Sequence, residues 1–226
     1  MIELVPVVEM EGWSYSDRPL PNTGSRFEDP PAWQAYHQSC LAYAGVTGIT
    51  MVVPGSALVR VAELDERALA LLAAHQLEKD DLPPPGKLDG DADEYAREYI
   101  GDLCGGLVLS VNGTVIAEPA CCGGLDSIEG WARALASADW DEPWIGHDLR
   151  RVQARADGDR IWLRSAAWGS DSWSEPVVVA RADGERAMAA AREQLARLAE
   201  RLTTVLPNIY DARWRTAIAR RFAGHR

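Results

Sequence analysis

Long apolar runs are missing from the 226-residue sequence, and no stretch reaches the roughly 18 residues that a membrane-spanning helix needs. The first residues, Met1–Pro6, have neither a basic segment nor a long apolar core, so we expect no signal peptide. Cysteine is scarce: the chain has only Cys40, Cys104, Cys121 and Cys122, and the adjacent pair is poorly placed to bond to itself. These absences predict a cytoplasmic protein with reduced thiols, rather than a membrane protein or a secreted disulfide scaffold.

The common local signatures of catalysis and nucleotide binding are absent as well. The sequence contains no G-x-G-x-x-G, G-x-x-x-x-G-K-S/T, G-x-S-x-G or H-E-x-x-H motif. Its two glycine pairs, Gly105-Gly106 and Gly123-Gly124, are too sparse to cradle a phosphate. We therefore expect no cofactor, and the commonest nucleotide-binding, hydrolase and metalloprotease classes are excluded.

The composition is that of an ordinary globular protein, with 47% hydrophobic and 25% charged residues. The net charge of −11 is unevenly distributed. Residues 1–184 hold 14 Lys/Arg and 30 Asp/Glu, whereas residues 185–226 hold 9 Arg and 4 Asp/Glu. An acidic body repels nucleic acid and attracts basic proteins. The charge pattern thus favours a basic protein over a nucleic acid as partner, with solubility alone as the alternative reason for the acidic charge, and we expect no membrane contact.

Periodicity predicts an α+β fold with one mostly antiparallel sheet of about six to eight strands and helices packed on it. Ile2–Glu9 is typical of a first strand, and Asn112-Gly113 between two β-branched runs predicts a type I′ hairpin. Val177–Arg181 is apolar enough for a central strand. We expect a single domain over residues 1–226, with a soft internal boundary in the proline-rich loop 78–94.

Two amphipathic stripes predict a helical pair at the C-terminal end. Apolar residues recur three and four apart over 188–205, after an N-cap expected at Asp183, and every fourth residue over 210–222. Packing on the sheet is the simplest use of these stripes. A homodimer through the two helices is the alternative.

The cysteine pair is the first candidate for chemistry. Cys121 and Cys122 precede a predicted helix whose N-terminus, with Asp126 as N-cap, would lower a thiol pKa. His147 and Asp148 supply a base and an orienting carboxylate, which completes a hypothetical catalytic set. The alternative is that small cysteines fill a tight strand-to-helix turn, and we favour it. No C-x₂₋₄-C spacing occurs, so we expect no metal site.

Tryptophans crowd the second half of the chain and are the second candidate. Exposed indoles are enriched at binding surfaces, although large aromatics also cover hydrophobic cores. The candidate binding residues are Trp140, Trp144, Trp168 and Trp173.

One segment resembles a motif of uncharacterised bacterial proteins. Residues 112–131 contain P-x-C-C-G-x-L followed by a tryptophan, and residues 146–148 are Gly-His-Asp. Some members of that family are similar to the immunity proteins that neutralise bacterial toxins. The resemblance implies a non-catalytic module that binds and inhibits a basic toxin, while a cysteine-dependent enzyme using Cys121 or Cys122 with His147 is the alternative.

Overall fold

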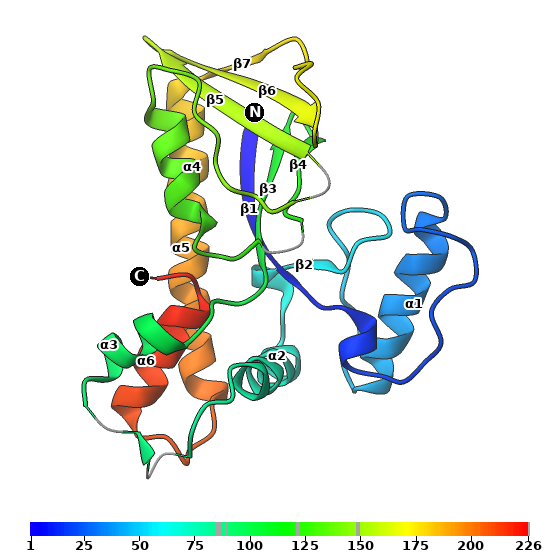
Figure 1. The fold of residues 1–226 in the computed structure, drawn as a ribbon, viewed down its shortest axis with the longest axis vertical. Helices are drawn as coiled ribbons and strands as arrows, with labels where there is room; N and C mark the ends of the chain where they lie inside the picture. Colours follow the sequence, from blue (N-terminus) through cyan, green and yellow to red (C-terminus); the bar gives the residue numbers. More distant parts are fainter. Residues whose placement is uncertain (85–86, 89, 121–122, 148–149, 226) are drawn as a thin grey trace. The chain divides into compact units, whose positions relative to one another are not determined.

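The computed structural model describes residues 1–84, 87–88, 90–120, 123–147 and 150–225 (Figure 1). The chain divides into two compact units. Unit 1 comprises Met1–Pro6 and Cys104–Leu195, and unit 2 comprises Val7–Leu103 and Ala196–Arg226. Strand β1 (Ile2–Glu9) and helix α5 (Arg181–Val205) each contribute residues to both units. The loop 78–94 lies inside unit 2, so the crossings between units occur elsewhere in the chain.

The predicted α+β class is confirmed, but the single sheet of six to eight strands is wrong. The strands of the described chain form two antiparallel sheets, one with the order β2-β1-β3-β4 and one with the order β5-β6-β7. Alternating hydrophobicity specifies which neighbours form a hairpin, but not which hairpins share an edge, because that pairing is long-range. The strands are β1, β2 (Leu58–Arg60), β3 (Gly105–Val111), β4 (Thr114–Ala117), β5 (Arg150–Asp157), β6 (Arg160–Ala167) and β7 (Val177–Ala180).

The hairpin between β3 and β4 forms as predicted. Asn112 and Gly113 both have positive φ, at 52° and 80°, as a type I′ turn requires. Strand β3 is buried along its whole length, which explains its continuous apolar character.

The β5-β6-β7 sheet has two different faces because buried and more exposed side chains alternate along β5 and β6. Val152, Ala154 and Leu163 are fully buried on the inner face, while arginines and Trp162 occupy the outer one. Strand β7 pairs only with β6 among the described strands and is therefore an edge, not the central strand that its apolar sequence favours. Val178 is accordingly 40% exposed.

Helices of unit 2 begin at aspartates. Asp29, Asp65, Asp91 and Asp211 each accept a hydrogen bond from the backbone N–H three residues on, at 2.8–3.1 Å. These N-caps explain where the helices start and account for part of the acidic composition. The capped helices are α1 (Pro30–Tyr43), α2 (Glu66–Lys79), α3 (Ala92–Tyr99) and α6 (Ala212–Phe222); the unit also has short 3₁₀ turns, η1 (Gly12–Ser14) and η2 (Val61–Glu63).

The helix N-caps predicted at Asp183 and Asp126 are wrong. Asp183 lies within the first turn of α5, because the chain passes from β7 into the helix at Arg181. Asp126 precedes α4 (Ser127–Ala136), but its side chain accepts no capping hydrogen bond, since its own backbone is already helical.

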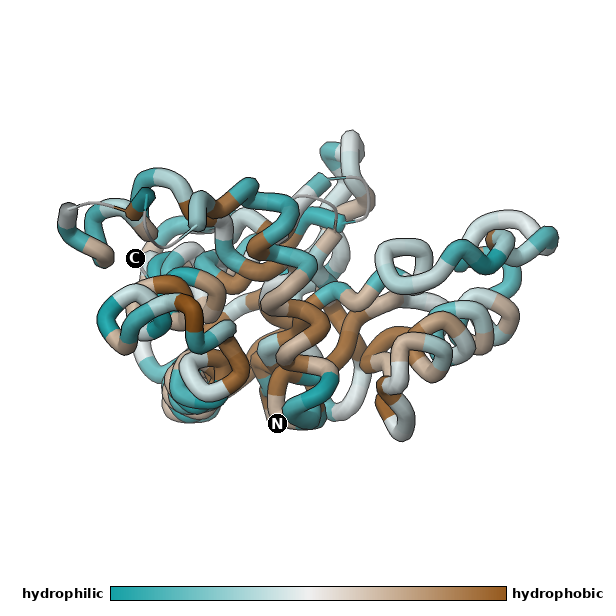
Figure 2. The backbone as a smooth tube through the Cα atoms, turned by 90° about the horizontal axis from the view of Figure 1, so that it is seen from below, coloured by the Kyte–Doolittle hydropathy of each residue, from teal (hydrophilic) through white to brown (hydrophobic). Residues whose placement is uncertain are grey.

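The apolar stripes of the C-terminal helices are buried within the chain. Leu195, Leu198 and Leu202 of α5 are at most 2% exposed, and Ile218 and Phe222 of α6 are fully buried. The helices in Figure 2 accordingly carry both hydrophobic and hydrophilic bands. No helix within the described ranges combines the length and the apolar character that crossing a bilayer requires.

Candidate functional site

The outer face of the β5-β6-β7 sheet carries a row of alternating arginines and indoles, here called the Arg–Trp stack. The guanidinium of Arg164 lies 4.0 Å from the ring centre of Trp140 and 4.9 Å from that of Trp173. Such contacts between a cation and an aromatic face are attractive and hold both groups in place. From one end to the other, the stack comprises Trp162, Arg155, Trp140, Arg164, Trp173 and Arg151.

Hydrogen bonds fix two of the three guanidinium groups of the stack, those of Arg164 and Arg151. Arg164 donates from Nε and Nη2 to Oε1 of Gln153, at 3.0 and 2.7 Å. Arg151 donates two bonds of 2.8 Å to the carboxylate of Glu142 in a bidentate pair. Trp140 and Trp173 therefore cover the sheet face and are half-buried in doing so.

The other two candidate tryptophans form a separate and exposed group. Trp144 is 49% exposed and Trp168 is 41% exposed. The two indoles and the ring of His147 contact one another: the His147 centroid lies 4.6 Å from that of Trp144 and 5.1 Å from that of Trp168, the two indole centroids are 6.5 Å apart, and all three contacts are edge-to-face. Two loops of unit 1, one before β5 and one after β6, thus supply one aromatic surface, the Trp144–His147–Trp168 cluster.

The loop that carries Trp144 is anchored on both sides of that residue. Asp141 exchanges two backbone hydrogen bonds with Ala154 of β5, at 2.9 and 3.0 Å. Its carboxylate accepts from Nε of Arg133 at 2.7 Å, and this hydrogen bond lowers the pKa of Asp141. On the other side of Trp144, the buried Ile145 accepts a backbone hydrogen bond from Ala120 at 2.8 Å. The indole is consequently presented by a fixed backbone, which reduces the entropy lost on binding.

The glycine pairs explain part of the segment that resembles the bacterial motif. The backbone N–H of Gly105 donates to the carbonyl of Gly123 at 3.1 Å, and Cys104 and Gly124 form an isolated bridge. A Cβ on Gly123 would lie 2.6 Å from the Gly105 oxygen. Close backbone approach therefore requires glycine at position 123, independently of any phosphate.

The hypothetical catalytic set is only partly visible. Cys121, Cys122 and Asp148 lie outside the described residues. His147 is described, is exposed, and contacts the two indoles. Over the described ranges, no group of three or more His, Cys, Asp or Glu side chains is arranged to hold a metal ion.

Unit 2 contains a second group of titratable side chains, around His37. His37 is 2% exposed and its Nδ1 accepts a hydrogen bond from the backbone N–H of Gly12 at 3.0 Å. Burial lowers the pKa of His37 to about 4. Partial burial, and next the carboxylate of Glu9, raise the pKa of Glu11 to about 7. Because the Nδ1 acceptor already serves Gly12, His37 has a structural role in holding η1.

The arginines of the stack were not among the residues predicted from the sequence. Arg151 and Arg155 lie four residues apart on β5, and Arg164 lies four residues after Arg160 on β6, so each pair faces one side of the sheet. This spacing is the signal in the sequence that could have identified the arginines. It could not show which loop tryptophans lie over which arginines, because those contacts join distant parts of the chain.

Comparison of the chain with protein-family models, with curated protein sequences and with solved structures finds no match in any of the three.

Proposed function

We propose that this chain is a protein-binding module that contacts its partner through the Trp144–His147–Trp168 cluster. The observation that carries the proposal is the exposure of two tryptophans on anchored loops. Tryptophan dominates the energetic hot spots of protein interfaces, because it offers a large rigid apolar area together with one hydrogen-bond donor. A cluster that served only the core would be covered, as Trp140 and Trp173 largely are.

The charge around the cluster favours a basic partner. Segments 137–149 and 168–176, which contain the two indoles, include six Asp or Glu residues and no Lys or Arg, although two of the six, Asp141 and Glu142, are paired with Arg133 and Arg151. Asp139, Asp171 and Glu175 are exposed there. Unit 1 as a whole holds 15 Asp/Glu against 9 Lys/Arg, a net charge of −6. Complementary charge accelerates association and discriminates against other acidic proteins.

The finer proposal is that the partner is a basic bacterial toxin and that binding inhibits it. The resemblance of residues 112–131 and 146–148 to proteins similar to immunity proteins supports this assignment. The acidic, aromatic surface supports it independently, since a module of this kind needs affinity and not catalysis.

A titration with matched variants tests the proposal. The purified chain is titrated by biolayer interferometry against a panel of cationic bacterial toxin domains and, for comparison, acidic proteins of similar size. We expect micromolar or tighter binding to a cationic member, and inhibition of its activity at equimolar ratio. The double variant W144A/W168A should weaken that binding at least tenfold, as loss of two hot-spot side chains does.

Trp13 provides the matched control, because it is 47% exposed but lies in unit 2. The variant W13A should bind as the unmodified chain does. Absence of binding to every cationic protein at micromolar concentration, or an equal loss in W13A, would contradict the proposal.

A cysteine-dependent enzyme is the second candidate, and one observation favours it. Ala120 and Gly123, the described residues on either side of the cysteine pair, both lie beside the carbonyl of Ile145, two residues before His147. Iodoacetamide labelling against pH tests this reading, with C121S and C122S to assign the thiol. Rapid labelling below pH 7 that slows in the variant H147A would support it; labelling only above pH 8 would exclude it.

A homodimer through the C-terminal helices has less support. The apolar side chains on which that hypothesis depends are buried in the chain itself, so a dimer would have to use other residues of α5 and α6. Sedimentation equilibrium at high protein concentration decides between monomer and dimer.

A further inference from the structure

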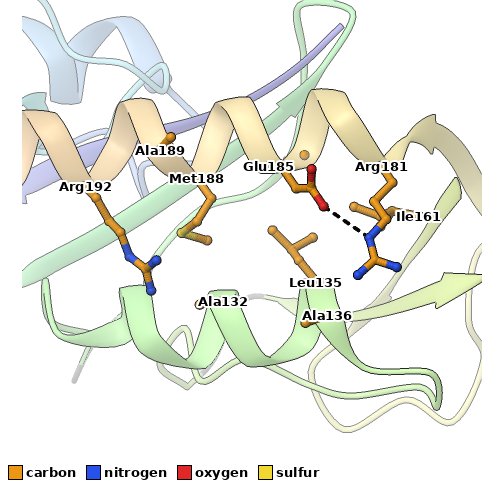
Figure 3. Close-up of a pocket in the computed structure, with 10 residues that line it drawn as sticks. Ala132, Leu135, Ala136, Ile161, Arg181, Glu185, Met188, Ala189 and Arg192 are labelled. Carbon is orange, nitrogen blue, oxygen red and sulfur yellow. Dashed lines mark hydrogen bonds and ion pairs between the residues drawn. The ribbon is translucent and has the colours of Figure 1, made fainter. Parts of the chain in front are cut away.

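A groove of about 550 Å³ lies in unit 1 between α4 and α5, with Ile161 of β6 at one end (Figure 3). Met188 and Arg192 of α5 point toward α4, and Leu135 of α4 points back toward α5. This volume is within the range of sites that hold small molecules. The groove is separate from the Trp144–His147–Trp168 cluster, since no residue is shared.

Small side chains on both helices leave the space open. Ala132 and Ala136 line the groove from α4, and Ala189 lines it from α5. Larger side chains at these three positions would fill the space between α4 and α5. Gly184 closes one end, because a Cβ there would lie 2.5 Å from Cδ1 of the buried Ile161. The apolar walls are therefore continuous from α4 across β6 to α5.

Guanidinium groups outnumber carboxylates among the side chains that line the groove, and Glu129, which pairs with Arg192, lies just outside that lining. The lining includes two guanidinium groups, Arg181 and Arg192, against the single carboxylate of Glu185. Arg181 is held by Glu185 at 3.2 Å, one helical turn away. The first turn of α5, which contains Arg181 and Gly184, also adds the partial positive charge of a helix N-terminus.

Arg192 has a weakly bound partner, Glu129, which another anion can replace. Its Nη2 lies 3.3–3.4 Å from the carboxylate oxygens of Glu129, at the long limit for a hydrogen bond, and both side chains are more than half exposed. A solvent-exposed pair of this kind contributes little, so an incoming anion can replace Glu129 at small cost.

We propose that this groove binds a small amphipathic anion, a molecule with an extended apolar body and one carboxylate. The apolar body lies along Leu135, Ile161 and Met188, and the carboxylate accepts hydrogen bonds from the guanidinium of Arg192. A neutral molecule of the same shape would leave Arg192 with its weak partner, and a cationic one would have to compete with Arg181 and Arg192 for the carboxylates of Glu185 and Glu129.

Calorimetric titration of the whole chain with three ligands of equal chain length tests the proposal. The ligands are decanoate, decanol and decylamine, each used below its aggregation concentration. We expect decanoate to bind at one site with a Kd below about 100 µM, at least tenfold tighter than either of the other two ligands.

Two substitutions on α5 distinguish the groove from the rest of the helix surface. R192Q should weaken decanoate binding at least tenfold. R186Q is the matched control, because Arg186 lies on the same helix, is ion-paired with Asp183 and does not line the groove; its affinity should not change. The filling variant A132F should abolish binding while the circular dichroism spectrum stays unchanged.

The double variant W144A/W168A should bind decanoate normally, so failure of the protein-binding proposal would not affect this one. Equal binding of decanoate and decylamine, an equal loss in R192Q and R186Q, or no decanoate binding at 1 mM would overturn the inference.

Discussion

At the scale of single residues, the chain places chemically similar side chains in contrasting environments. Trp140 and Trp173 stack on arginines over a sheet face, whereas Trp144 and Trp168 flank His147 and remain exposed. The four candidate tryptophans therefore fall into two pairs with different surroundings. Two of them stabilise the fold, and two are available to a partner.

Glu11 and His37 oppose each other in the pH dependence of stability. The folded pKa of Glu11 is raised to about 7 by partial burial, so its stabilising contribution is complete below pH 4.5 and is lost as the pH rises through 7. The folded pKa of His37 is lowered to about 4, so its contribution is complete above pH 6.5 and is lost as the pH falls toward 4.

The variant E11Q should therefore become more stable than the unmodified chain as the pH rises from 4.5 to 8. Because Glu11 is only partly buried, we expect a gain of about 1 kcal/mol at pH 8 and almost none at pH 4.5. Urea denaturation at several pH values measures the difference. E200Q, at an exposed position of α5, is the control and should show no such trend; a pH-independent effect of E11Q would contradict the assignment.

Arg164 should be irreplaceable by lysine in the Arg–Trp stack. A lysine keeps the charge but loses the planar group that lies against Trp140 and donates twice to Gln153. We expect R164K to lower the free energy of unfolding by about 1 kcal/mol in thermal denaturation. R160K, on the same strand with an exposed side chain, should have no measurable effect, and equal melting curves for both variants would refute the role.

At the scale of elements, local signals were predictable and long-range pairings were not. Asn112-Gly113 predicts its hairpin because the turn requires positive φ at adjacent positions, which few residues tolerate. The apolar sequence of β7 predicts a central strand, but the strand lies at an edge, since neighbours in a sheet are chosen by the rest of the chain.

The candidate site follows the same rule. The tryptophans were found from the sequence because their type and crowding are visible there. The partition of these tryptophans into a covered and an exposed pair depends on contacts between Trp140 and β6 and between His147 and Trp168, which are far apart in the chain. The groove was not found, because alanines such as Ala132 and Ala189 are ordinary helix residues in a sequence.

Two glycines should differ in their tolerance of alanine for different physical reasons. G123A places a methyl group against the backbone oxygens of Gly105 and Ala120, which cannot move independently, so we expect a loss of about 2–3 kcal/mol. G113A meets open space and costs only the strain of positive φ, about 1 kcal/mol. Chemical denaturation of both variants should rank them in this order, and the reverse order would be inconsistent with the close approach.

At the scale of the whole molecule, the residues that stabilise the chain differ from those proposed to bind a partner. The buried stripes of α5 and α6, the capped helices of unit 2 and the Arg–Trp stack of unit 1 stabilise the chain. We expect the acidic loops with their exposed indoles to contribute little to the stability of the chain. W144A/W168A should accordingly keep the melting temperature within about 2 °C of the unmodified chain while losing partner affinity. Differential scanning fluorimetry checks the first expectation, and a large drop in melting temperature would assign the cluster to the core.

Hydrogen–deuterium exchange of the chain, with and without its tightest cationic partner from the toxin panel, locates the surface that the partner covers. We expect new protection to be concentrated in the two loops around Trp144 and Trp168, with exchange around Trp13 and η1 unchanged. Protection that spares both loops and appears on unit 2 instead would contradict the proposal.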